Sequence, residues 1–98
     1  VETLRALSKR GHRLILFTMR SGEKLEAAVR WFRDRKIELW AVNENPEQRS
    51  WTASPKVYAD YYIDGSALGC PIMFIDGVRH PVVNWSKVRT MLEYNRVL

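Results

Sequence analysis

One stretch decides the fold, and it reads LILFTMRSG over residues 14–22. Residues 14–17 are continuously apolar, which is typical of a strand covered on both faces in a parallel sheet. Thr18 closes this strand with a hydroxyl. Ser21 then stands as a candidate helix N-cap, with Glu23 in the favourable first turn. The stretch therefore predicts a buried strand that leads through a short connection into a helix.

Helix and strand patterns flank this stretch on both sides. Apolar residues recur at helical spacing over residues 1–9, and Gly11 follows in the place of a C-terminal cap. A second apolar stripe predicts a helix that ends at Lys36. Residues 37–42 and 61–64 are interpreted as further short strands. This order predicts an α/β fold with a Rossmann-like, three-layer parallel sheet that carries helices on both faces.

The pattern changes toward the C-terminus. Two apolar runs, residues 72–75 and 81–83, flank the dipeptide Asp76-Gly77 and predict a small antiparallel hairpin. Asn84 is placed to cap a final amphipathic helix. The parallel sheet is thus expected to be followed by a hairpin and a helix.

Length and composition set the scale of the protein. The chain has 98 residues, of which 46% are hydrophobic, enough for one domain with one core. No apolar run approaches the roughly 20 residues of a membrane span. The single cysteine, Cys70, cannot form an internal disulfide, so a cytoplasmic location is expected. Because residue 1 is valine, we expect residues 1–98 to be the C-terminal portion of a single domain.

The net charge of +5 suits anionic partners. The basic residues are scattered along the chain, however, and those between Arg30 and Lys36 cluster at an expected helix C-terminus, where they oppose the helix dipole. The helix-dipole interpretation therefore takes most of the weight, and the scattered distribution argues against a nucleic-acid partner.

Polar residues follow the apolar runs where the predicted strands end. Ligands of open parallel sheets bind outside the carboxyl ends of the strands. Thr18 ends the first strand, Asp64 ends the third, and Lys56 lies in the segment that enters the third. A hydroxyl and a lysine suit a phosphate, and a carboxylate suits Mg²⁺. These three residues form the predicted phosphate and Mg²⁺ site.

The stretch LILFTMRSG (14–22), taken with PKVYADYYID (55–64), resembles the haloacid dehalogenase (HAD) superfamily, and most of all its small capless hydrolases. The resemblance covers nearly the whole chain and rests on the order and spacing of the motifs. It implies a HAD-type sheet, a Mg²⁺ cofactor and phosphatase-type hydrolysis. Thr18 matches the residue that hydrogen-bonds the transferring phosphoryl group, Lys56 matches the lysine that neutralises its charge, and Asp64 matches a metal ligand.

Two departures from the superfamily pattern matter. Gly65 stands where the fourth motif usually has a second acid. The first motif, Asp-x-Asp on the central strand, is not in this chain. We therefore expect the central strand and its nucleophile to lie upstream of Val1, and the 98 residues alone to be inactive.

Each site residue also has a structural interpretation. Thr18 suits the end of any strand, Lys56 suits any solvated surface, and Asp64-Gly65 is a common turn signal. Arg20 could contact a substrate phosphate or be an ordinary loop arginine, and Met19 lies beside it. Residues 43–55 are expected to form a long polar loop that could line the substrate site.

The sequence thus predicts a Mg²⁺-dependent hydrolase in which Thr18 and Lys56 are catalytic, residues 18–20 and Lys56 bind a small phosphorylated substrate, and Asp64 binds the metal. The alternative is a non-catalytic HAD-like binding module or an inactive fragment.

Overall fold

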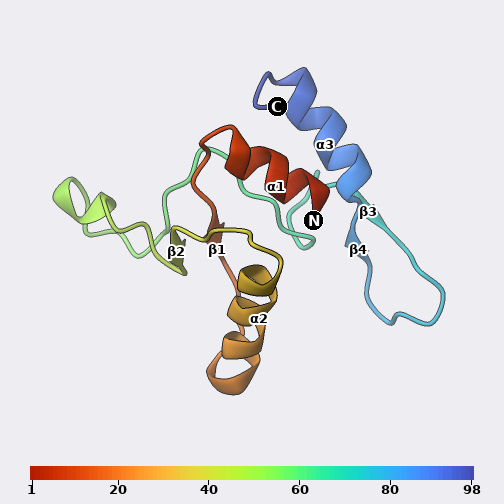
Figure 1. Ribbon diagram of the computed structural model, residues 1–98, viewed down its shortest axis with the longest axis horizontal. Coiled ribbons are helices and arrows are strands. Elements are labelled where there is room, and N and C mark those ends of the chain that lie inside the picture. Colours follow the sequence, from red (N-terminus) through yellow and green to blue (C-terminus); the bar gives the residue numbers. More distant parts are fainter. The chain divides into compact units, whose positions relative to one another are not determined.

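The computed structural model describes residues 1–98 and divides them into two units, Val1–Asp60 and Tyr61–Leu98, each of which is described by itself (Figure 1). Strands of the first unit pair only within that unit, and strands of the second pair only within the second. The single-domain organisation expected from the sequence stays a prediction.

The first unit contains the βαβ arrangement predicted from residues 14–42. Its elements in chain order are α1 (Glu2–Lys9), β1 (Ile15–Leu16), α2 (Gly22–Asp34), β2 (Ala41–Val42) and the 3₁₀-helix η1 (Gln48–Ser50). β1 and β2 are parallel, with Ile15 opposite Ala41 and Leu16 opposite Val42. α2 is the crossover between them, as a parallel pair requires (Figure 1).

Both strands are shorter than predicted, and for the second a local hydrogen bond accounts for the loss of its first residue. At the start of the second strand, the Ile37 N–H donates to the Phe32 carbonyl at 2.9 Å and so belongs to the end of α2. At its end, Asn43 has a φ of +54°, which no regular strand allows. The sheet of the first unit therefore has two strands, and the wider three-layer arrangement stays a prediction.

The core of the first unit is built from apolar side chains of α1, α2 and the segments after them. Leu7, Ala28, Ile37 and Val57 are buried there, each with less than a tenth of its surface exposed. Burying an aliphatic side chain contributes about 1.5–3 kcal/mol relative to leaving it in water. These buried side chains form the apolar core of the first unit.

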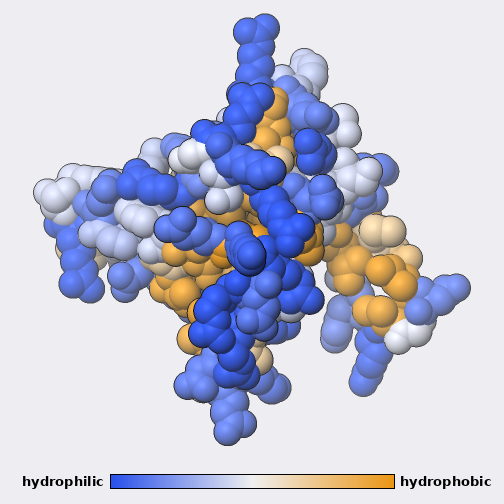
Figure 2. Space-filling model, viewed as in Figure 1, coloured by the Kyte–Doolittle hydropathy of each residue, from blue (hydrophilic) through white to orange (hydrophobic).

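The second unit confirms the predicted hairpin and final helix. β3 (Ile72–Met73) pairs antiparallel with β4 (Val82–Val83), and the turn closes where the Val78 N–H donates to the Ile75 carbonyl at 3.0 Å. α3 (Trp85–Tyr94) follows, and the Asn84 Oδ1 accepts the Lys87 N–H at 3.1 Å, the predicted N-cap. Apolar side chains stay exposed along the hairpin (Figure 2).

The strand predicted over residues 61–64 is wrong for this structure, which has no strand there. Asp64 instead opens a turn: its carbonyl accepts the Ala67 N–H at 2.9 Å and its Oδ1 accepts the Ser66 N–H at 2.8 Å. An aspartate side chain that binds the backbone two residues on favours a turn over an extended ladder. The turn interpretation of Asp64-Gly65 is the one that the structure contains.

No helix of the structure is both long enough and apolar enough to cross a membrane.

Candidate functional site

Thr18 lies just past β1, at the carboxyl edge of the parallel pair. Its backbone N–H donates to Oδ1 of Asn43 at 2.8 Å, while the Asn43 N–H donates to the Leu16 carbonyl at 2.8 Å. One residue therefore joins the ends of both strands. The Thr18 hydroxyl accepts the Arg20 N–H at 3.1 Å. A hydroxyl that accepts this bond still has one proton to donate, which suits a phosphoryl oxygen.

Met19 and Arg20 occupy the exposed connection between Thr18 and α2. The bond from the Arg20 N–H to the Thr18 hydroxyl turns the backbone immediately after the strand. Arg20 is exposed and takes part in none of the three ion pairs of the structure. Its guanidinium is accessible to an anion from solvent, as the predicted substrate contact requires.

Gln48 is buried, with 7% of its surface exposed, and its side-chain amide binds the segment that carries Lys56. Nε2 donates to the Lys56 carbonyl at 2.9 Å and to the Ser54 carbonyl at 3.2 Å, and Oε1 accepts the Tyr58 N–H at 2.8 Å. Three backbone groups of one short segment are thus satisfied by one amide. A buried amide is tolerated because its groups are paired in this way.

Two further contacts hold the same loop. Asn45 Nδ2 donates to the Tyr58 carbonyl at 3.0 Å, next to the bond that the Tyr58 N–H makes to Gln48. Arg13 binds the Glu47 carboxylate at 2.9 Å, and its guanidinium lies 4.1 Å from the centroid of the Trp40 ring. The cation–π contact and the ion pair link the loop to the segment that enters β1.

Lys56 has an exposed side chain on a backbone that is held from both sides. Its N–H donates to Ser54 Oγ at 3.2 Å, its carbonyl accepts from Gln48, and the neighbouring Val57 is buried at 7% exposure. Trp51 and Tyr58 meet edge to face nearby in the chain, with ring centroids 5.5 Å apart. The lysine therefore emerges from an ordered loop, as a phosphate-binding lysine must.

A single segment, residues 43–48, contacts both Thr18 and the backbone of Lys56. Its first side chain, Asn43, holds the Thr18 N–H, and its later side chains, Asn45 and Gln48, hold the Lys56 segment. Thr18 and Lys56 are two predicted site residues that lie 38 positions apart in the sequence. This loop contacts both of them within the first unit.

Asp64 belongs to the second unit. Its side chain is exposed, and one of its carboxylate oxygens accepts the Ser66 N–H. The other oxygen is the part of this residue that suits a cation.

Asp64 is the one residue of this chain that the sequence predicts as a magnesium ligand. Mg²⁺ prefers octahedral oxygen ligands, usually one or two carboxylates with waters and substrate oxygens. The structure contains no group of three or more His, Cys, Asp or Glu residues that could hold a metal. Asp64, with Gly65 after it, supplies a single carboxylate. The Mg²⁺ site stays a prediction.

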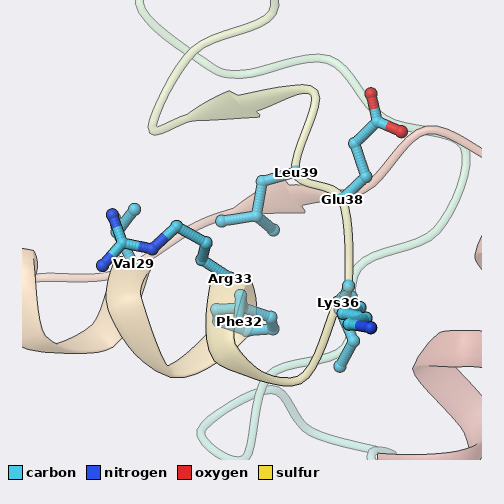
Figure 3. Close-up of a pocket in the computed structure, with 7 residues that line it drawn as sticks. Val29, Phe32, Arg33, Lys36, Glu38 and Leu39 are labelled. Atoms are coloured by element: carbon cyan, nitrogen blue, oxygen red, sulfur yellow. The ribbon is translucent and has the colours of Figure 1, made fainter.

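A groove of about 370 Å³ lies elsewhere, at the end of α2 and before β2 (Figure 3). Its lining includes Phe32, Lys36, Ile37 and Leu39, and the Leu39 side chain points toward the last turns of α2. Residues 37–39 precede β2, whereas Thr18 and Asn43 follow the strands. The groove is therefore at the opposite edge of the strand pair from the predicted site.

Sequence reasoning missed the residues that hold the site. Asn43, Asn45 and Gln48 were included only as part of a long polar loop, and none was assigned a role. Their density of amide side chains is a weak signal, because Asn and Gln are common in solvated loops. Only the tertiary contacts distinguish them from surface polar residues.

Comparisons with known proteins give one informative match. No protein-family model matches the chain, and no curated protein matches it. The solved structure of a conserved protein from Bacteroides thetaiotaomicron aligns with a TM-score of 0.71 and 33% sequence identity, over 96% of this chain and 69% of that one. This chain belongs to the family of that conserved protein. The match includes residues of both units, since it covers almost the whole chain.

Proposed function

We propose that the intact protein is a HAD-like, Mg²⁺-dependent phosphohydrolase acting on a small phosphorylated substrate. An aspartate upstream of this chain is the nucleophile, and this chain supplies Thr18, Lys56 and Asp64. The observation that carries the proposal is the loop of residues 43–48, which contacts both Thr18 and the Lys56 segment. A site for a phosphoryl group needs its donors fixed relative to one another.

The chemistry assigned to each residue follows from its contacts. The Thr18 hydroxyl donates its remaining proton to a phosphoryl oxygen, and the Lys56 ammonium neutralises charge on the same group. Arg20 and Met19 line the approach of the substrate. Asp64 and the upstream acids would hold a Mg²⁺ ion, which would supply positive charge beside the substrate oxygens. The residues of this chain bind and orient the phosphoryl group, which is the main protein contribution to phosphoryl transfer.

The test is a phosphatase assay on the full-length protein, with p-nitrophenyl phosphate as the substrate and Mg²⁺ present. Lys56→Ala should lower kcat about 10²–10³-fold, because one electrostatic donor to the reacting group is removed. Lys24→Ala, an exposed lysine of α2, is the matched control and should leave kcat unchanged. Normal turnover by Lys56→Ala would remove Lys56 from the site.

A second candidate is a non-catalytic HAD-like binding module with the same loops. The turn at Asp64 favours it, since one carboxylate oxygen is already engaged by Ser66 and a glycine follows. This candidate predicts binding of inorganic phosphate without Mg²⁺ and no turnover. Calorimetric titration of the full-length protein with phosphate, with and without Mg²⁺, separates the two.

A further inference from the structure

We propose that Gln48 is a positioning residue for Lys56: its buried amide fixes the backbone from which the lysine side chain reaches the phosphoryl group. The inference rests on the proposed function and deepens it. Gln48 does not contact substrate in this proposal. It acts through the backbone of residues 54–58.

The first argument is burial. Gln48 is 7% exposed, and polar residues are rarely buried unless their groups are paired. No buried side-chain nitrogen or oxygen of the structure is left without a hydrogen-bond partner. The Gln48 amide is therefore part of a fully satisfied network, which is the condition under which a buried polar network makes its surroundings rigid.

The second argument is the pattern of bonds. Ser54 and Lys56 present carbonyls to Nε2, and Tyr58 presents its N–H to Oε1. The contacted residues alternate along the segment, and Lys56 is the middle one. A primary amide is the side chain that offers two donors and an acceptor on one planar group. Neither a carboxylate nor a hydroxyl can make all three bonds.

The third argument is the direction of the side chains. Val57, next to Lys56, is buried, whereas the Lys56 side chain is exposed. Pro55, on the other side, has a fixed φ and no N–H to pair. The backbone is thus held by the Gln48 amide and by the burial of Val57, while Lys56 itself is an exposed residue. Lysine has a long flexible stem, so the position of its backbone decides where the charge can reach.

The experiment is a double-mutant cycle in the full-length protein, assayed with p-nitrophenyl phosphate and Mg²⁺. Gln48→Leu removes all three bonds at similar volume and should lower kcat/KM about 10–100-fold, the usual cost of small misplacement. In the Lys56→Ala background the same change should lower kcat/KM by no more than about twofold, because a residue that acts through Lys56 is not additive with it. Ala28→Gly, which weakens α2 away from the loop, should leave kcat/KM unchanged in both backgrounds.

A second readout does not depend on activity. Hydrogen exchange at the Tyr58 amide should accelerate in Gln48→Leu and stay slow in Ala28→Gly. Should Gln48→Leu fail to fold, Gln48→Glu keeps the acceptor for Tyr58 and loses both donors. It should keep the Tyr58 amide protected and still lower kcat/KM.

Two outcomes overturn the inference alone: an equal loss of kcat/KM from Gln48→Leu in both backgrounds, or unchanged exchange of the Tyr58 amide in Gln48→Leu. Full activity of Lys56→Ala refutes the proposed function and the inference with it. The two failures are therefore distinguishable.

Discussion

Replacing Lys36 with glycine should stabilise the protein, because all three helices end in the same motif and only α1 has glycine at the position that needs it. In α2 the Lys36 N–H donates to the Arg33 carbonyl and the Ile37 N–H to the Phe32 carbonyl, the two bonds of a Schellman cap. The residue after the cap is then left-handed: φ is +87° at Gly11 and +56° at Lys36.

The magnitude follows from the backbone. A side chain in the left-handed region costs roughly 1–2 kcal/mol, which Lys36→Gly removes. Glycine also lowers the stability by about 0.5–1 kcal/mol, because it gives the unfolded chain greater conformational freedom. The expected net gain in the free energy of unfolding is therefore about 0.5–1 kcal/mol.

The assay is urea unfolding of the full-length protein. The free energy of unfolding falls by about 1–3 kcal/mol per molar urea, so the midpoint should rise by a few tenths of a molar while this slope stays constant. Lys36→Ala is the control: it keeps a Cβ and should give no gain. Gly11→Ala is the reverse change and should cost about 1 kcal/mol, since its new Cβ meets no atom within 4 Å and the loss is conformational.

A lower midpoint for Lys36→Gly than for Lys36→Ala would refute this reasoning. It would show that the lysine side chain contributes more at the helix end, through the dipole or the groove, than its backbone conformation costs.

Three further predictions concern side chains that bind backbone or each other. Asn43→Gly keeps the left-handed backbone and removes the acceptor of the Thr18 N–H. The Thr18 amide should therefore exchange faster with solvent, and the free energy of unfolding should fall by about 1 kcal/mol. An unchanged exchange rate would contradict this prediction. Asn84→Ala should cost about 1 kcal/mol in thermal unfolding by removing the cap of α3, whereas Asn84→Asp should cost little, and an equal loss for both would show that the cap is not the cause. Glu47→Gln, which leaves the Arg13–Trp40 contact in place, should cost less than about 1 kcal/mol in urea unfolding at low salt, because both partners of the Arg13–Glu47 pair are more than half exposed; a larger loss would contradict the solvent-screened pair.

Much of the local structure was predictable from neighbouring residues. Helix periodicity placed α1, α2 and α3, Gly11 marked the end of α1, and Asn84 marked the start of α3. The hairpin turn at Asp76-Gly77 was equally readable. Each of these features depends on contacts within about four residues, so the sequence carries the signal directly.

The ends of the other helices show where that signal stops. Lys36 and Arg96 occupy left-handed positions with no glycine to mark them, and the Schellman bonds form there nonetheless. The Val97 N–H donates to the Leu92 carbonyl at 2.8 Å, and Leu92 is buried. One buried apolar residue flanks each of these caps, Ile37 after α2 and Leu92 before the end of α3, and its burial offsets the cost of one strained residue.

Sequence by itself determined the helices, the first strand, the parallel pairing across α2 and the residue types suited to phosphate, because periodicity and strand-end chemistry are local. Tertiary structure alone decided that β1 and β2 are only two residues long and that Asp64 opens a turn. It also decided that Gln48, eight residues before Lys56, is buried and holds that lysine's backbone. A polar side chain acquires such a role only when the chain folds back to bring unpaired backbone groups within its reach, and no periodicity in the sequence encodes that approach.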